Sequence, residues 1–106
     1  LKPHQHFKRQ GLDLYLTLPV TLNEAYSGTT AEVPTPSGRV KLRVPPLSQN
    51  GSKLRLRGKG VPRGKSVGDM YAVLDVRMPE RSNAQLEDAL KEADALYPDL
   101  RGDIEL

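Results

Sequence analysis

The sequence predicts a mainly β protein: a small β-sandwich of short antiparallel strands and hairpins, with one short internal helix and a C-terminal helix. Leucine and valine alternate with polar residues over several short stretches, which is the period of a strand with one buried face. Turns rich in proline and glycine separate these stretches. Of the two stretches with helical spacing, one is very short and the other lies near the C-terminus, so the core has to form between strands.

The first predicted strand spans residues 13–20, where every even-numbered position is Leu or Val. Pro19 cannot donate to a ladder, so this end of the strand lies at an edge or an exit. Thr21 and Glu24 then fit a capping box, in which each side chain accepts a backbone N–H of the other residue. They predict a helix of barely two turns that Gly28 closes in a left-handed conformation.

A hairpin and two further strands are expected after this helix. Residues 29–35 and 39–44 flank a turn at Pro36-Ser37-Gly38 and predict the hairpin. The remaining β part consists of a short strand with basic outer residues, a glycine-rich loop and the longest alternating strand. These three segments are residues 53–57, 58–69 and 70–78, and Pro79 ends the last strand.

The C-terminal stretch predicts an amphipathic helix. Ser82 to Gln85 fits a second capping box, and Pro98 ends the helical pattern. Apolar residues recur at helical spacing, and the opposite face is acidic. The apolar face packs either on the protein's own sheet or on a second copy of the chain, and the pattern leaves both open. Its members are Leu86, Ala89, Leu90, Ala93, Leu96 and Tyr97.

The chain of 106 residues is long enough for one domain with a single core. With one Phe and no Trp, that core has to be built from Leu and Val. The absence of cysteine excludes disulfide scaffolds, thiol catalysis and cysteine-based metal sites. No apolar run approaches the ~18 residues that a membrane span needs, and no signal peptide is visible. We expect a β-sandwich over residues 1–80, a helix over 81–98 and a tail over 99–106, and, because Leu1 is not Met, a piece of a longer protein.

Charge is distributed unevenly along the chain. Residues 1–79 carry 13 basic and 5 acidic groups, whereas residues 80–106 carry 3 basic and 8 acidic groups. Nine basic residues and no acidic one lie between Arg39 and Lys65. This stretch is either a solvated outer sheet face, which we favour, or a surface for nucleic acid or an acidic partner. It contains no Phe, Tyr or Trp, which argues against a stacking platform for single strands and leaves duplex binding open.

The sequence offers no convincing catalytic or metal site. Gly64-Lys65-Ser66 ends like a P-loop, but the preceding glycines are misplaced and a strand follows where a P-loop needs a helix. His4 and His6 could share one side of a strand, yet two ligands without a third do not make a metal site. No pair of carboxylates or Ser–His–Asp arrangement is apparent. We therefore expect no enzyme activity, no metal and no cofactor.

Short motifs follow one another along the chain. The first two are His4-x-x-Phe7-x-Arg9-x-Gly11-x-Asp13-Leu14-Tyr15 and Val20-Thr21-Leu22-Asn23-Glu24-Ala25 with Gly28. The next are Val33-Pro34-Thr35 with Gly38-Arg39-Val40, and Leu56-Arg57-Gly58-Lys59-Gly60-Val61-Pro62 with Gly68-Asp69-Met70-Tyr71. In this combination the sequence resembles the C-terminal client-binding region of DnaJ-type (forty-kilodalton heat-shock) co-chaperones. The resemblance is to the second β-domain of that region and covers about residues 4–79.

This resemblance implies a cytoplasmic co-chaperone domain that helps hold unfolded polypeptides for the seventy-kilodalton heat-shock chaperone, with no membrane partner. It also implies a homodimer formed through the helix after the last strand. By position, the dimerisation residues are Leu86, Leu90, Leu96 and Tyr97. The client groove, between the first strand and the segment after the short helix, involves Leu16, Leu18, Ala31, Val33 and Thr35.

The strength of client binding follows from the residues of this groove. Burying one Leu or Val contributes roughly 1.5–3 kcal/mol, so a groove with few such anchors binds clients only weakly. Pro19 and Pro34 also remove backbone donors that strand addition uses. We expect the domain mainly to space and dimerise its parent protein. The alternative is a nucleic-acid-associated DnaJ-like protein that uses the basic Arg39–Lys65 face.

Overall fold

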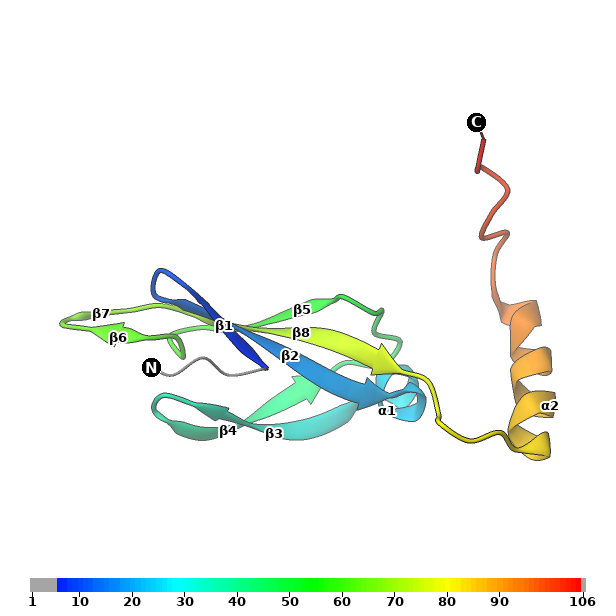
Figure 1. The fold of residues 1–106 in the computed structure, drawn as a ribbon, viewed down its shortest axis with the longest axis horizontal. Helices are drawn as coiled ribbons and strands as arrows, with labels where there is room; N and C mark the ends of the chain where they lie inside the picture. The colour runs from blue at the N-terminus through cyan, green and yellow to red at the C-terminus, as the bar shows by residue number, and fades with distance from the viewer. Residues whose placement is uncertain (1–5, 106) are drawn as a thin grey trace.

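The computed structural model of the chain describes residues 6–105 and contains two facing sheets, as Figure 1 shows. The larger sheet has four strands in the order β1–β2–β8–β5. These strands are β1 (Phe7–Gln10), β2 (Asp13–Thr21), β8 (Met70–Arg77) and β5 (Lys53–Leu56). The smaller sheet is the hairpin of β3 (Thr29–Thr35) and β4 (Gly38–Val44). The predicted small, mainly β fold is thereby confirmed.

The central strand pair corrects one detail of the prediction, which had only antiparallel strands. β2 and β8 run parallel, in a register that pairs Leu14 with Met70 and Thr21 with Arg77. Parallel neighbours need a long crossover between them, and here the chain builds α1, the β3–β4 hairpin and β5 before it returns as β8. All other strand pairs in the described part of the chain are antiparallel.

The core lies between the two sheets. Alternate residues of β2 and β8 face the hairpin, as their period of two predicts. The largest fully buried side chains are Met70, Leu74, Val33 and Val44. Leucine and valine make up most of the rest of the core, as expected for a chain with so few aromatic residues. The remaining buried apolar residues are Leu14, Leu16, Val20, Ala25, Leu42, Val61 and Ala72.

The short helix α1 (Leu22–Ser27) connects the two sheets, and its capping box forms as predicted. The Thr21 hydroxyl accepts the Glu24 N–H at 3.1 Å, and the Glu24 carboxylate accepts the Thr21 N–H at 3.0 Å. Gly28 ends the helix with a φ of 81°. A Cβ at this glycine would lie 3.0 Å from the Val44 carbonyl oxygen, so the close approach of β4 also requires glycine.

Three of the described strands were not predicted. β1 pairs with the first half of β2, and β6 (Pro62–Arg63) and β7 (Ser66–Val67) form a small hairpin inside the predicted glycine-rich loop. Strands of two residues are too short to show an alternating pattern. Backbone hydrogen bonds hold this hairpin in place. They run from Gly60 N–H to Gly68 O at 2.8 Å and from Val61 N–H to Leu12 O at 2.8 Å.

The C-terminal helix α2 (Ala84–Ala93) is followed by a 3₁₀ turn, η1 (Asp94–Leu96). Its N-cap is Asn83, not the predicted Ser82, because the extended Asn83 places its side-chain oxygen 3.0 Å from the Leu86 N–H. The helix also ends earlier than predicted, before Leu96 and Tyr97. Figure 1 shows α2 standing apart from the sheets at the end of an extended segment, and none of its residues is buried. Within residues 6–105, no helix has the length and apolar character that crossing a membrane requires.

Candidate functional site

The residues of the predicted client groove lie on the facing sides of β2 and β3. Two of them belong to the core: Leu16 is 6% exposed and Val33 is 1% exposed. Thr35 is half-buried, and its hydroxyl lies 2.5 Å from the Gly38 carbonyl oxygen in the turn of the β3–β4 hairpin. Leu18 and Ala31 are half-buried and present part of their apolar surface. In this conformation, Leu18 and Ala31 are the apolar residues of the predicted set that a client could contact.

The edge of β2 beside Leu18 is open over its second half. β1 pairs with β2 only as far as Leu16, and the Thr17 N–H then donates to the His6 carbonyl oxygen at 2.8 Å. In the described part of the chain, no strand pairs with β2 beyond that point on the β1 side. An extended segment along this edge would have to donate to carbonyl oxygens of β2, because Pro19 has no N–H and Glu24 binds the Thr21 N–H.

The four predicted dimerisation residues share one end of the molecule. Leu86 and Leu90 lie on α2, Leu96 lies in η1 and Tyr97 follows it. Leu90 is 41% exposed, Leu96 is 76% exposed and Tyr97 is 60% exposed. Leu86 is half-buried, so none of the four side chains is buried.

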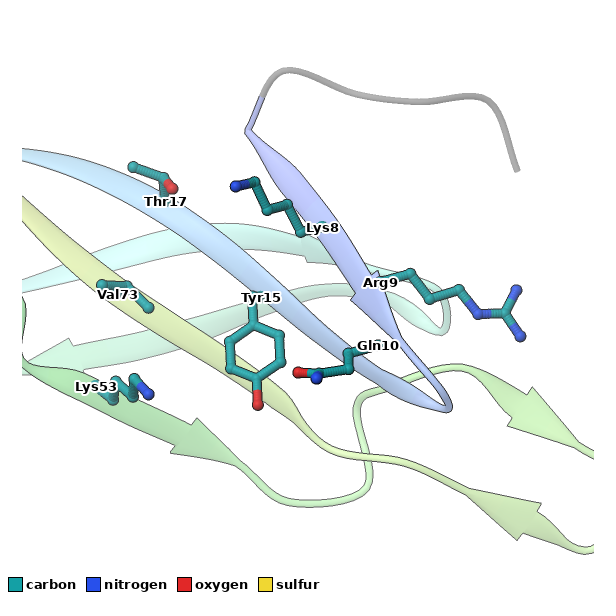
Figure 2. Close-up of a pocket in the computed structure, with 7 residues that line it drawn as sticks. All are labelled: Lys8, Arg9, Gln10, Tyr15, Thr17, Lys53 and Val73. Carbon is teal, nitrogen blue, oxygen red and sulfur yellow. The ribbon is translucent and has the colours of Figure 1, made fainter.

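The outer face of the four-stranded sheet, turned away from the β3–β4 hairpin, combines aromatic and basic residues. Tyr15 of β2 and Tyr71 of β8 are register partners, and their rings stack with centroids 5.1 Å apart. The Lys53 ammonium lies 5.8 Å from the centre of the Tyr15 ring. A shallow hollow of about 530 Å³ lies beside the Tyr15 ring. Figure 2 shows the residues that line it.

Sequence reasoning missed this arrangement of Tyr15 and Tyr71. It noted that the basic stretch from Arg39 to Lys65 lacks aromatic residues, and that is true of the stretch itself. The sheet order nevertheless places β8 beside both β2 and β5, so tyrosines from outside the stretch lie next to Lys53. The local patterns did not show the parallel register of β2 and β8 that places Tyr15 beside Tyr71.

Asp69 ties the basic loop after β5 to the larger sheet. Its Oδ2 accepts hydrogen bonds from Nε and Nη2 of Arg55 at 2.9 and 2.6 Å, and its Oδ1 accepts the Gly58 N–H at 2.8 Å. Its own N–H donates to the Asp13 carboxylate at 2.9 Å. The hydrogen bond from Gly58 and then those from Arg55 favour the charged carboxylate and lower the pKa of Asp69. These two carboxylates hold backbone groups in place, which is a structural role.

The described residues contain no group of three His, Asp or Glu side chains that could hold a metal ion. Of the two histidines considered for such a site, His4 lies outside the described residues. The segment Gly64-Lys65-Ser66, which resembled the end of a P-loop, forms the turn and start of β7 in the small hairpin. No helix follows it, so it lacks the structural context of a phosphate-binding loop.

Comparison with known protein families identifies the family of this domain. Residues 1–79 match the family model of the DnaJ C terminal domain. The chain belongs to this family. Over 98 residues it is 41% identical to the chaperone protein DnaJ of Geobacillus sp. (strain WCH70), covering 91% of the chain and 26% of that protein. Over 85 residues it is 47% identical to the curved DNA-binding protein of Coxiella burnetii (strain Dugway 5J108-111), covering 80% of the chain and 27% of that protein. The chain thus spans about a quarter of the length of these relatives.

In this DnaJ C-terminal domain, the motifs that carried the resemblance form a structural scaffold. The Arg-Gly-Lys-Gly loop begins at Arg57, and the Gly58 N–H in it binds Asp69 of the Gly-Asp pair. The Gly60 N–H donates to the Gly68 carbonyl oxygen, and a side chain at either glycine would overlap backbone atoms, including the Leu12 carbonyl oxygen. These motifs therefore fix the basic loop against the sheet and supply no reactive group.

Proposed function

We propose that this DnaJ C-terminal domain serves a cytoplasmic co-chaperone. In this proposal it forms a homodimer through α2 and weakly binds unfolded polypeptide for hand-over to the seventy-kilodalton heat-shock chaperone. Membership of the family supports the chaperone role, and relatives named chaperone protein DnaJ match most of the chain. No enzyme activity forms part of this proposal.

The exposed apolar face of α2 is the observation that carries the dimer. A ten-residue helix is marginal in water on its own and normally gains its stability from packing. Leu90, Leu96 and Tyr97 are exposed, and a second copy is the partner that the proposal assigns to them. A two-fold contact between identical helices would bury the same face on both copies.

Client binding is assigned to the open edge of β2 beside Leu18 and Ala31. Each such anchor contributes at most a few kcal/mol before the costs of association, so a single domain binds weakly. A dimer presents two of these edges, and a long unfolded chain can occupy both at once. The second contact is then intramolecular, which raises the overall avidity without a new kind of contact.

Suppression of aggregation tests this proposal, because it should depend on the dimer. The wild-type chain and its Leu90→Asp variant are added at equal concentration to a chemically unfolded client, and light scattering is followed. We expect the wild type to suppress aggregation and the variant to lose most of that effect. Glu87→Gln, on the acidic side of α2, is the control and should behave as wild type. Equal suppression by wild type and Leu90→Asp would refute the link between dimer and client binding.

The nucleic-acid alternative is not favoured. One relative is named a curved DNA-binding protein, and the chain spans about a quarter of it, as it does of the relatives named chaperone protein DnaJ. A single-strand platform needs free aromatic faces on which bases can stack. Here Tyr15 and Tyr71 stack on each other, and the Lys53 ammonium lies over the Tyr15 ring.

A further inference from the structure

The hollow on the outer face of the four-stranded sheet lies on the opposite side of the sheet from the core and from Val33 of β3. Figure 2 shows the side chains around it, which come from β1, β2, β8 and β5. Tyr15 and Val73 are half-buried and form its apolar floor. Lys8 of β1 and Lys53 of β5 border it from the two edges of the sheet. Its lining contains no acidic residue.

The charges of Lys8 and Lys53 are not neutralised within residues 6–105, because neither forms an ion pair there. Other cations of this sheet are engaged. Arg55 binds Asp69, and Arg77 binds Asp75 with its Nε 2.6 Å from the carboxylate. Arg9, which also borders the hollow, donates from Nε to the Gly11 carbonyl oxygen at 2.8 Å. Two ammonium groups without a carboxylate partner in the described chain therefore flank one apolar floor, and that of Lys53 also lies 5.8 Å from the centre of the Tyr15 ring.

We propose that this hollow binds an extended acidic peptide segment that carries an apolar side chain between two carboxylates. Four neighbouring strands span about 14 Å from the first to the last, because adjacent strands lie about 4.8 Å apart. An extended peptide covers that length in about four residues, and alternate side chains point to the same side. A segment of the form Glu-x-Leu-x-Glu would set its carboxylates near Lys8 and Lys53 and its leucine over Val73 in the floor of the hollow. This site is independent of the α2 dimer and of the β2 edge.

The observations favour a peptide over a nucleic acid at this site. A nucleic acid gains most of its affinity from several phosphate contacts and from bases stacked on aromatic rings. The hollow offers two ammonium groups, and the stacking of Tyr15 on Tyr71 occupies ring faces that bases would need. Two carboxylates with one apolar residue between them match the positive charge of the hollow and its apolar floor.

Titration of the whole chain with short labelled peptides, followed by amide chemical shifts at low salt, tests the proposal. The probe is Glu-Ser-Leu-Ser-Glu with blocked ends, and we expect it to bind with a Kd on the order of 100 μM and to shift the amides of Lys8, Tyr15 and Val73. The double variant Lys8→Gln/Lys53→Gln should bind about tenfold more weakly, since it loses two exposed charge pairs. Gln-Ser-Leu-Ser-Gln and Glu-Ser-Ser-Ser-Glu should each bind much more weakly than the probe.

A matched control separates a local site from the general positive charge of the chain. Lys41→Gln/Lys65→Gln removes the same charge from exposed residues of β4 and of the β6–β7 turn. This variant should bind the probe as the wild type does. The proposal is refuted if both double variants lose affinity equally, or if the glutamine peptide binds as well as the probe. It is also refuted if a short oligonucleotide binds more tightly than the probe and shifts the same amides.

Discussion

Arg55 and Asp69 are joined by two hydrogen bonds to one carboxylate oxygen, from Nε at 2.9 Å and from Nη2 at 2.6 Å. Arg55 belongs to β5 and Asp69 directly precedes β8, so the pair links two neighbouring strands. The other carboxylate oxygen accepts the Gly58 N–H, which anchors the loop that continues into the β6–β7 hairpin. One side chain therefore fixes both the sheet edge and the loop.

The stability of the domain should depend on pH through Asp69. Its hydrogen bonds with Gly58 and Arg55 lower its pKa from the ordinary value of 3.8 in the unfolded chain. Because the pKa of Asp69 is lower in the folded state, the ionised carboxylate stabilises the fold fully above pH 3.8. This stabilisation is lost as the pH falls through the pKa of Asp69 in the folded state. Urea unfolding of wild type and Asp69→Asn should show a constant difference in unfolding free energy from about pH 7 to about pH 5. That difference should shrink below about pH 4.

A comparison with the Asp75→Asn variant controls for surface charge. Asp75 pairs only with the exposed Arg77, and it accepts no backbone N–H among the bonds of the described chain. Its loss should change stability less than the loss of Asp69. A pH-independent difference between wild type and Asp69→Asn would contradict the assignment of the lowered pKa to this carboxylate.

Gly68 should not tolerate even a methyl group. A Cβ there would overlap the Leu12 carbonyl group, and backbone cannot move aside as a flexible side chain can. We expect Gly68→Ala to lower the unfolding free energy by about 3 kcal/mol or more, measured by urea denaturation. Gly64→Ala is the control: its φ is 59° and nothing lies within 4 Å of the added atom, so only backbone strain of about 1–2 kcal/mol remains. Similar losses in both variants would show that steric overlap at Gly68 is not the cause.

Met70 and Met78 form a matched pair for testing the core. Met70 is 0% exposed, whereas Met78 is 68% exposed just after β8. Met70→Ala should cost about 2–5 kcal/mol of unfolding free energy in denaturant titrations, because it removes buried atoms and leaves a cavity. Met78→Ala should change it by less than about 0.5 kcal/mol. Equal effects at both positions would contradict a core between the two sheets.

Local patterns in the sequence predicted most of the fold. The alternation in residues 13–20 and 70–78 identified β2 and β8, and the Thr21–Glu24 capping box located α1 to the residue. What the sequence missed depends on long-range pairing. The parallel register of β2 and β8 and the contact of β1 with β2 arise from segments whose order in the sheet no local period encodes.

The site residues show the same division between local and long-range information. The alternating pattern predicted that Leu16 and Val33 lie on the inward faces of their sheets. It could not show that the opposite sheet covers these two residues and buries them in the core. The apolar face of α2 was predictable from spacing alone, because the spacing depends only on the helix itself, but the spacing left open whether the protein's own sheet covers that face. Tyr15 and Tyr71 are 56 positions apart in sequence, and only the sheet brings their rings together.

Sedimentation equilibrium of the wild-type chain and Leu90→Asp tests most directly whether α2 holds two copies together. A charged side chain in the centre of the helix contact would be left unpaired, which costs several kcal/mol and should separate the copies. Circular dichroism and the Glu87→Gln control establish that the β-sandwich remains folded. For a dimer held by α2, we expect twice the chain mass for the wild type and for Glu87→Gln, and the single-chain mass for Leu90→Asp. A wild type that sediments as a single chain, or a Leu90→Asp variant that remains fully dimeric, would contradict it.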